Sequence, residues 1–274
     1  MATMKITSFT DQGSGAMNED DLLIKDNLFC VFDGVTSLVK YVGPDGITGG
    51  KLGSYLVKEI FKSNSEKPLL EIAKLANNKL REEMVKRNID VSSKPNLWGT
   101  TLAVIRIVGD YVEYMQVADS YILFIDKKEK TTSIPTSLKI DQKTLILLKK
   151  LLDEGIEEAR CDERVLGLQM KTRKRVNLDY GTLNGEERVF DFIVTGKMPL
   201  NDVRHILLLT DGIKVLQEDP EKDEDMQILT NLFLRGGLKA LKDYVRNAEE
   251  SDLECKKYPR TKIHDDATAI AISF

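Results

Sequence analysis

The sequence predicts an α+β fold in which antiparallel sheets are covered by helices. Strand-like runs come in adjacent groups, amphipathic helical segments separate these groups, and strict strand–helix–strand alternation is missing. The chain has 274 residues, and it contains no repeat, low-complexity tract or linker rich in Pro, Gly or Ser. We therefore expect a single domain over residues 1–274.

Short strand-like runs occupy the first quarter of the chain, at 5–9, 22–25 and 28–32. The Asp26–Asn27 pair between the last two runs tolerates a tight turn, which predicts a hairpin. Helical spacing then predicts a helix over 48–62, whose apolar face consists of Leu52, Tyr55, Leu56, Ile60 and Phe61.

A second amphipathic helix is predicted from about residue 68 to residue 87, with Pro68 in its first turn. Its apolar side consists of Leu69, Ile72, Leu75, Ala76, Leu80 and Met84. Residues 100–126 predict a meander of three strands, because Gly109–Asp110 and Asp119–Ser120 suit the two turns.

The second half of the chain has weaker patterns. Residues 141–160 predict a charged helix with a leucine-rich face, whereas 161–204 mixes charges with turn signals and gives no clear pattern. A strand is predicted at 206–209, followed by a helix within 228–249 that Gly236–Gly237 weakens. The last residues, ATAIAISF, predict a closing strand.

Composition excludes several classes of function. The net charge of −4 gives no electrostatic reason to expect nucleic acid as a partner. Cys30, Cys161 and Cys255 are an odd number without paired spacing, so we expect free thiols and neither disulfides nor a zinc site. No apolar run approaches the roughly 18 residues of a membrane span, and the N-terminus lacks a secretory signal. We expect a cytoplasmic protein without membrane association.

Acidic residues recur where strand-like runs end beside a small residue. Asp33 ends the run LFCVF and precedes Gly34, and Asp211 follows HILLLT in the same way. A charge at the end of a buried strand is unfavourable unless a partner compensates it, so two such ends suggest one shared partner. The acidic residues placed in this way are Glu19, Asp20, Asp33, Asp119, Asp211, Asp265 and Asp266.

Carboxylates with few histidines nearby are ligands for hard ions such as magnesium or manganese. A glycine after the aspartate allows a sharp turn and brings its carbonyl within reach of an ion. Each member alone has a simpler interpretation: Asp119 in a hairpin turn is a turn former, and one Asp-Gly pair is common. Two Asp-Gly strand ends together with two acidic pairs favour a metal site.

The order of these motifs resembles that of the metal-dependent protein phosphatases, the type 2C serine/threonine phosphatase family, in its bacterial form. The resemblance runs from Asp11 to the C-terminus, and its motifs are NED, VFDGVT, the Gly49–Gly50 pair, WGTTLAVI, VADSYILFI, LLLTDGI and DDATAIAI. It implies a four-layer αββα sandwich, with two antiparallel sheets packed face to face and helices outside.

The resemblance also implies a centre of two divalent ions, Mg²⁺ or Mn²⁺, at one edge of the sheets. By motif, Asp33 would bridge both ions and Gly34 would offer its carbonyl, while Asp211 and Asp265 would complete the protein ligands of one ion. The catalytic residues expected on this basis are Asp33, Asp211 and Asp265. A hydroxide shared by the two ions would attack the phosphorus of a phosphomonoester.

Three further acidic residues have implied roles. Glu19 would reach the second ion through water, and Asp20 would support it. Asp119 corresponds to an aspartate that helps hold a third, weaker metal ion in bacterial relatives.

The chain departs from the family pattern at three places. Ala16 and Met17 occupy the region where many members have an arginine that binds the substrate phosphate. Val35 stands where the eukaryotic form has a histidine that is proposed to protonate the leaving group, and Ala118 stands where glycine is usual.

Other groups could bind the phosphate: the amides of Gly13–Gly15, Lys40, Lys51 or the basic run 171–175, for which a solvated patch is the more ordinary interpretation. His264 beside Asp265 is a candidate proton donor, although a structural role is favoured.

The leading hypothesis is a metal-dependent phosphomonoesterase that acts on phosphoserine or phosphothreonine in proteins. An alternative is a catalytically weak or inactive type 2C-like module that binds phosphoproteins or regulatory partners. A sugar or nucleotide phosphatase also stays open. Hydrolases with an N-terminal nucleophile share the layered shape, but removal of Met1 would expose Ala2, which cannot act as one. Residues 127–204 depart most from the pattern and are expected to select the substrate.

Overall fold

Within the residues that the structure describes, ten strands form two five-stranded sheets in which every neighbouring pair is antiparallel. The computed structural model describes residues 4–35, 38–39, 41–134 and 139–274. One sheet contains, in spatial order, β1 (Lys5–Asp11), β10 (Ala267–Ser273), β9 (Val203–Leu209), β6 (Tyr121–Asp126) and β7 (Thr131–Ser133). The other contains β2 (Asp21–Lys25), β3 (Leu28–Gly34), β4 (Thr100–Val108), β5 (Tyr111–Val117) and β8 (Val194–Pro199).

The two sheets pack face to face, so their central strands are apolar on both sides. In β3, Phe29 and Val31 face the other sheet, whereas Cys30 and Phe32 belong to a cluster with the helices outside. The side chains of β10 alternate in the same way, and Ile270 and Ile272 lie between the sheets. Burial of both faces explains why these strands are continuous apolar runs instead of alternating ones.

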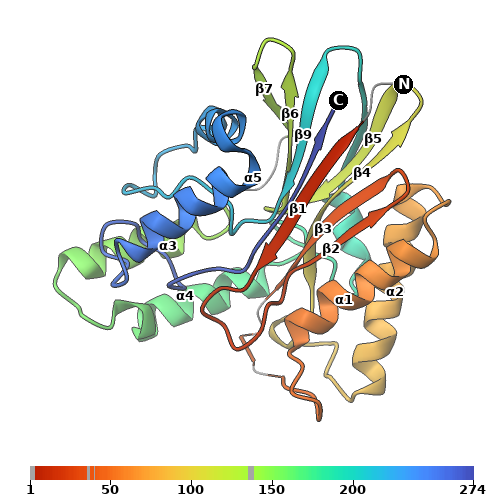
Figure 1. Ribbon diagram of the computed structural model, residues 1–274. Coiled ribbons are helices and arrows are strands. Elements are labelled where there is room, and N and C mark those ends of the chain that lie inside the picture. Colours follow the sequence, from red (N-terminus) through yellow and green to blue (C-terminus); the bar gives the residue numbers. More distant parts are fainter. Residues whose placement is uncertain (1–3, 36–37, 40, 135–138) are drawn as a thin grey trace.

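Helices cover the outer faces (Figure 1). Helices α1 (Gly49–Ser63) and α2 (Leu69–Lys86) pack on the β2–β8 sheet, and α5 (Met226–Glu250) packs on the β1–β7 sheet. Gly236 and Gly237 interrupt α5, because their backbone angles are not helical. These layers confirm the predicted α+β, four-layer αββα sandwich.

A helical hairpin lies at one end of the sandwich (Figure 1). It consists of α3 (Gln142–Asp153) and α4 (Glu163–Lys174), which share a small apolar cluster of Leu148, Leu151, Leu152, Ala159 and Val165. The 3-10 turns η1 (Lys94–Asn96), η2 (Ala159–Cys161) and η3 (Glu187–Asp191) complete the regular elements of the described ranges. Among these elements, no helix is long and apolar enough to cross a membrane.

The predicted meander over 100–126 is wrong in its third strand. Strands β4 and β5 pair, but β6 lies in the other sheet, next to β9. Ala118 adopts a φ of 61° at the crossing, in the left-handed region that favours glycine. The chain thus changes sheets at Ala118–Ser120, and Asp119 lies at the junction of the two sheets.

Other differences are local. The helix predicted over 141–160 ends at Asp153, and 161–204 contains α4 and β8, for which no pattern was found. Tyr55 and Leu75 lie outside the buried helix faces, with 46% and 38% of their surface exposed. Pro68 is the N-cap of α2, one residue before its first turn.

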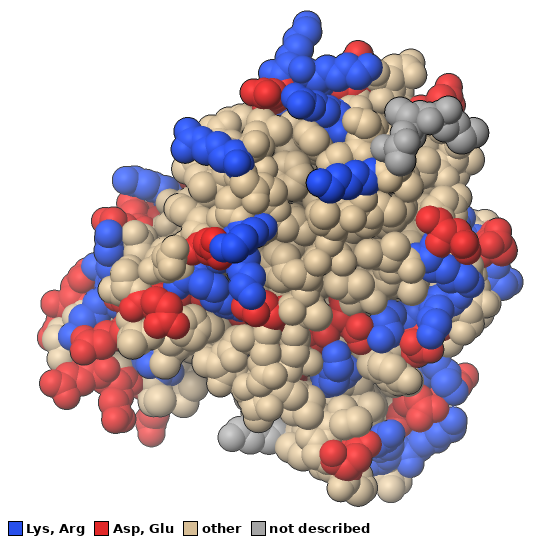
Figure 2. Space-filling view, viewed as in Figure 1, with Lys and Arg blue, Asp and Glu red and all other residues tan. Residues whose placement is uncertain are grey.

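Basic and acidic side chains are interspersed around the face shown in Figure 2, and many of them lie next to one another. This distribution agrees with the small net charge of −4.

Candidate metal centre

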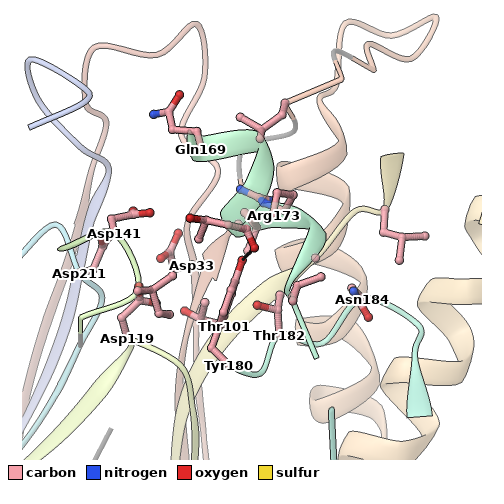
Figure 3. Close-up of a pocket in the computed structure, with 18 of the residues that line it drawn as sticks. Asp33, Thr101, Asp119, Asp141, Gln169, Arg173, Tyr180, Thr182, Asn184 and Asp211 are labelled. Carbon is pink, nitrogen blue, oxygen red and sulfur yellow. Dashed lines mark hydrogen bonds between the residues drawn. The ribbon is translucent and has the colours of Figure 1, made fainter. Parts of the chain in front are cut away.

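Four predicted aspartates meet at the end of the sandwich that faces α4. Antiparallel pairing explains why: β3, β5 and β9 end there, and β4 and β10 begin there. Asp33 is the penultimate residue of β3, Asp119 follows β5, Asp211 follows β9 and Asp265 precedes β10. All four line one cavity of about 300 Å³, together with Gly34 (Figure 3).

Burial and mutual repulsion shift the pKa values of these carboxyls. Burial and then the charges of Asp211, Asp20 and Asp119 raise the pKa of Asp33 well above its usual range. Burial, with Asp211 and Asp141 nearby, raises the pKa of Asp119 to about 8. The carboxylates are therefore close enough to oppose one another's ionisation.

Two lysines offset part of this negative charge. The Nζ of Lys214 lies 3.3 Å from Asp211 Oδ2, and the Nζ of Lys262 lies 2.6 Å from Asp265 Oδ1. Burial still raises the pKa of Asp211, whereas Lys262 and Lys214 outweigh burial at Asp265 and lower its pKa. The carboxylates in turn raise the pKa of both lysines, so both ammonium groups are charged at neutral pH.

The donor set fits a hard divalent ion. Its members are carboxylate oxygens that repel one another, which is the environment that Mg²⁺ or Mn²⁺ stabilises. Within the described part of the chain, no three His, Cys, Asp or Glu side chains are spaced as the ligands of one ion. Asp211 and Asp265 instead face lysines, and they keep 26% and 25% of their side-chain surface exposed. We expect metal binding to turn these two side chains away from the ammonium groups.

Glu19 and Asp20 do not line the cavity. Asp20 Oδ2 accepts a hydrogen bond of 2.8 Å from Thr210 Oγ1, and burial raises the pKa of Asp20 to about 8. Thr48 Oγ1 donates to Glu19 Oε1. Asp20 still raises the pKa of Asp33, so it is electrostatically part of the cluster. The roles of Glu19 and Asp20 as ligands stay predictions.

Gly34 is required by close packing. A Cβ at Gly34 would come within 2.4 Å of the Glu19 carbonyl oxygen and 2.6 Å of that of Gly50. The start of α1 and the NED segment can approach Asp33 only because this position has no side chain.

Asp266 has a structural role. Its carboxylate accepts hydrogen bonds of 2.7 Å from the backbone N–H groups of Gly13 and Glu19. It therefore ties the loop that carries Glu19 to the start of β10, beside Asp265.

The other groups considered for the phosphate are mostly engaged elsewhere. The Gly13 amide binds Asp266, and Lys51 Nζ donates to the Asp20 carbonyl at 2.7 Å. Lys40 lies outside the described residues. Within the run 171–175, Thr172 and Arg173 line the cavity.

The two histidines have protein partners. His264 Nδ1 lies 3.0 Å from Glu249 Oε2, and His205 Nδ1 lies 2.7 Å from Ser273 Oγ.

Sequence reasoning missed Asp141, Lys214 and Lys262, which lie in or beside the site. It named Arg173 only as part of the basic run 171–175, for which a solvated patch is the favoured interpretation. The two lysines could have been found from the sequence, because each lies three residues from Asp211 or Asp265 along the chain. Asp141 is the N-cap of α3, where the sequence showed no motif.

The raised pKa values predict how pH and metal ions change stability. The pKa values of Asp20 and Asp119 are about 8, against a usual value of 3.8. Between these values the folded, metal-free protein binds more protons than the unfolded chain, so its stability falls as pH rises toward about 8. A divalent ion replaces those protons, and we expect Mg²⁺ to raise Tm more at pH 8 than at pH 6.

Thermal melts with Mg²⁺ or EDTA at the two pH values measure this effect. Asp119→Asn should reduce the difference, because one of the carboxyls with a raised pKa is removed. An equal or larger Mg²⁺ shift at pH 6 would contradict the prediction.

An αββα sandwich with carboxylates gathered at one end of its sheets fits the class of metal-dependent hydrolases. A family model described as "Protein phosphatase 2C" matches residues 11–249. The chain belongs to the protein phosphatase 2C family, whose members are metal-dependent serine/threonine phosphatases.

Solved bacterial phosphatases share the fold. The serine/threonine phosphatase PstP/Ppp of Mycobacterium tuberculosis is 17% identical with a TM-score of 0.59, and 99% of this chain and 98% of that chain are covered. Stp1 of Staphylococcus aureus is 17% identical with a TM-score of 0.57, over 100% and 96% of the two chains. PppA of Pseudomonas aeruginosa is 16% identical with a TM-score of 0.58, over 100% and 99%. The comparison with curated proteins finds no match.

Proposed function

We propose that this chain removes phosphate from phosphoserine and phosphothreonine in proteins, with two Mg²⁺ or Mn²⁺ ions in the cavity at the sheet ends. The observation that carries this proposal is the meeting of Asp33, Asp119, Asp211 and Asp265 in one cavity, where burial and then mutual repulsion raise the pKa of the first three. A solved relative, the catalytic domain of PstP, is in complex with two manganese ions, which supports the choice of ion.

Asp33, Asp211 and Asp265 would hold the ions, with the Gly34 carbonyl as a neutral ligand. Glu19 and Asp20 would support the second ion, and Asp119 would hold a third, weaker one. Bound ions supply Lewis acidity, which lowers the pKa of water and offsets charge on the phosphoryl group.

The protein's own contribution is to hold these ligands in place. Pairing of β3 with β4 fixes the backbone of Asp33 opposite Thr101. Asp266 fixes the loop of Glu19, and the Arg246 side chain donates a 2.8 Å hydrogen bond to the Asp265 carbonyl. Pre-positioned ligands need little reorganisation during the reaction.

Two further observations support the proposed compartment and domain organisation. Cys30, Cys161 and Cys255 are free thiols, which suits the reducing cytoplasm that we propose. The core shared by the two sheets supports a single domain over residues 1–274.

Hydrolysis of p-nitrophenyl phosphate and of a phosphothreonine peptide, with Mn²⁺ or with EDTA, tests the proposal. We expect EDTA to lower kcat by about 10³-fold or more, because metal ions contribute several kcal/mol of transition-state stabilisation. Excess Mn²⁺ should restore the rate. Absence of turnover in Mn²⁺-saturated protein would contradict the proposal and favour the binding module, and turnover that EDTA leaves unchanged would contradict the metal mechanism.

A further inference from the structure

The cavity has two chemically different walls. One carries the carboxylates, and the other comes from α4 and the segment after it (Figure 3). The polar residues of the second wall are Gln169, Thr172, Arg173, Tyr180, Thr182 and Asn184. The cavity volume of about 300 Å³ is at the lower end of the range for ligand pockets, which suits a phosphoryl group on a short side chain.

Three cations are among the lining residues of the described chain: Lys94, Arg173 and Lys262. Lys94 Nζ is held by both carboxylate oxygens of Glu186, at 2.6 and 2.7 Å, and by the Val176 carbonyl. Lys262 pairs with Asp265 at 2.6 Å. Lys94 thus fastens the second wall to η1, and Lys262 offsets a carboxylate of the first wall.

Among the basic residues of the run 171–175, Arg173 lines the cavity. Lys171, Lys174 and Arg175 are exposed, and Arg175 pairs with Asp179 at 2.5 Å. The turn that carries Arg173 is fixed, because Tyr180 Oη donates a 3.3 Å hydrogen bond to the Thr172 carbonyl. Figure 3 shows Arg173 on α4 near Tyr180, across from the side of Asp119, Asp141 and Asp211.

Electrostatics agree with this placement. Burial raises the pKa of Tyr180 to about 12, while Arg173 acts to lower it and Asp141 and Asp119 act to raise it. The phenol therefore lies within electrostatic reach of both walls.

We propose that Arg173 binds the phosphate of the substrate, in place of the N-terminal arginine whose region holds Ala16 and Met17. The inference rests on the proposed function and adds a residue to it. Five carboxylates line the cavity and would repel a bound phosphate. The phosphate therefore needs positive charge from the second wall as well as from metal ions at the carboxylates. The planar guanidinium offers two parallel N–H donors that match two phosphate oxygens, whereas an ammonium group acts as a point charge without this geometry.

Kinetics of Arg173→Ala, Arg173→Lys and Lys174→Ala with Mn²⁺ and a phosphothreonine peptide test this role. For Arg173→Ala we expect KM and the inhibition constant of inorganic phosphate to rise together by about tenfold to a hundredfold, as for lost hydrogen bonds between charged groups. Arg173→Lys should recover part of the loss, because lysine restores the positive charge but not the two parallel N–H donors of the guanidinium. Lys174→Ala, on the exposed side of the same turn, should match wild type.

The half-saturating Mn²⁺ concentration and Tm should be unchanged in Arg173→Ala, which separates phosphate binding from a structural role. Phosphate inhibition equal to that of wild type, or loss of phosphate binding accompanied by weaker Mn²⁺ binding, would overturn the proposal. Calorimetry of inorganic phosphate with Mn²⁺-loaded protein tests Arg173 independently of turnover. An inactive wild type that binds phosphate through Arg173 would thus overturn the proposed function and keep this site.

Discussion

Asp33→Asn is expected to lower metal-dependent kcat by about 10³-fold or more and to leave the metal-free protein at least as stable as wild type. The two effects have one cause. Burial and the neighbouring carboxylates raise the pKa of Asp33, so its ionised form is unfavourable without a cation. Asparagine removes that charge from the metal-free protein, and it also removes the anionic oxygen that the ions require.

Steady-state kinetics with Mn²⁺ and thermal melts in EDTA measure the two effects separately. Asp110→Asn is the matched control, because Asp110 is an exposed aspartate in the β4–β5 turn. We expect that variant to keep the activity and stability of wild type. Retained turnover in Asp33→Asn, or a large drop in its metal-free Tm, would contradict the role of Asp33.

Arg260→Ala is expected to lower the free energy of unfolding by about 3–5 kcal/mol, the usual effect of breaking a buried ion pair. Arg260 and Asp252 lie 2.9 Å apart, and only 8% and 7% of their side-chain surfaces are exposed. The guanidinium also donates to the carbonyls of Glu249, Tyr258 and Ile263. Its loss would leave a buried carboxylate without its counter-charge, although backbone N–H groups of residues 256–258 still donate to it, and several carbonyls without a donor.

Urea unfolding measures this change, and Lys256→Ala is its control. Lys256 lies in the same loop, with 57% of its side chain exposed and a surface partner, so we expect a change within about 0.5 kcal/mol. The loop also carries Lys262 and Asp265, so Arg260→Ala should raise the half-saturating Mn²⁺ concentration as well. A loss of stability below about 1 kcal/mol would show that the buried pair does not hold the loop.

The sequence predicted those parts of the site that have a local pattern. An apolar run that ends in Asp-Gly identifies both the strand and its exposed end, so Asp33 and Asp211 could be placed before their distance was known. Antiparallel pairing of β9 with β10 then brings Asp265 to the same end as Asp211. The order of motifs added the layered fold and Asp119.

The remaining features depend on contacts between distant segments. The change of sheet at Ala118–Ser120 has no local signal, because β6 is as apolar as a third meander strand would be. Arg173 belongs to a basic run whose other cations are exposed, and only the packing of α4 places it at the cavity. The pairs of Lys214 and Lys262 with the aspartates are likewise a result of folding.

The central claim is that Asp33, Asp211 and Asp265 hold divalent ions together. Anomalous X-ray scattering from crystals grown with Mn²⁺ tests it most directly, because it locates manganese without any assumption about activity. We predict manganese in the cavity in contact with Asp33, one ion also bound by Asp211 and Asp265, and those two carboxylates turned away from Lys214 and Lys262. Well-ordered crystals with both lysine pairs intact and manganese elsewhere, or absent, would contradict the claim.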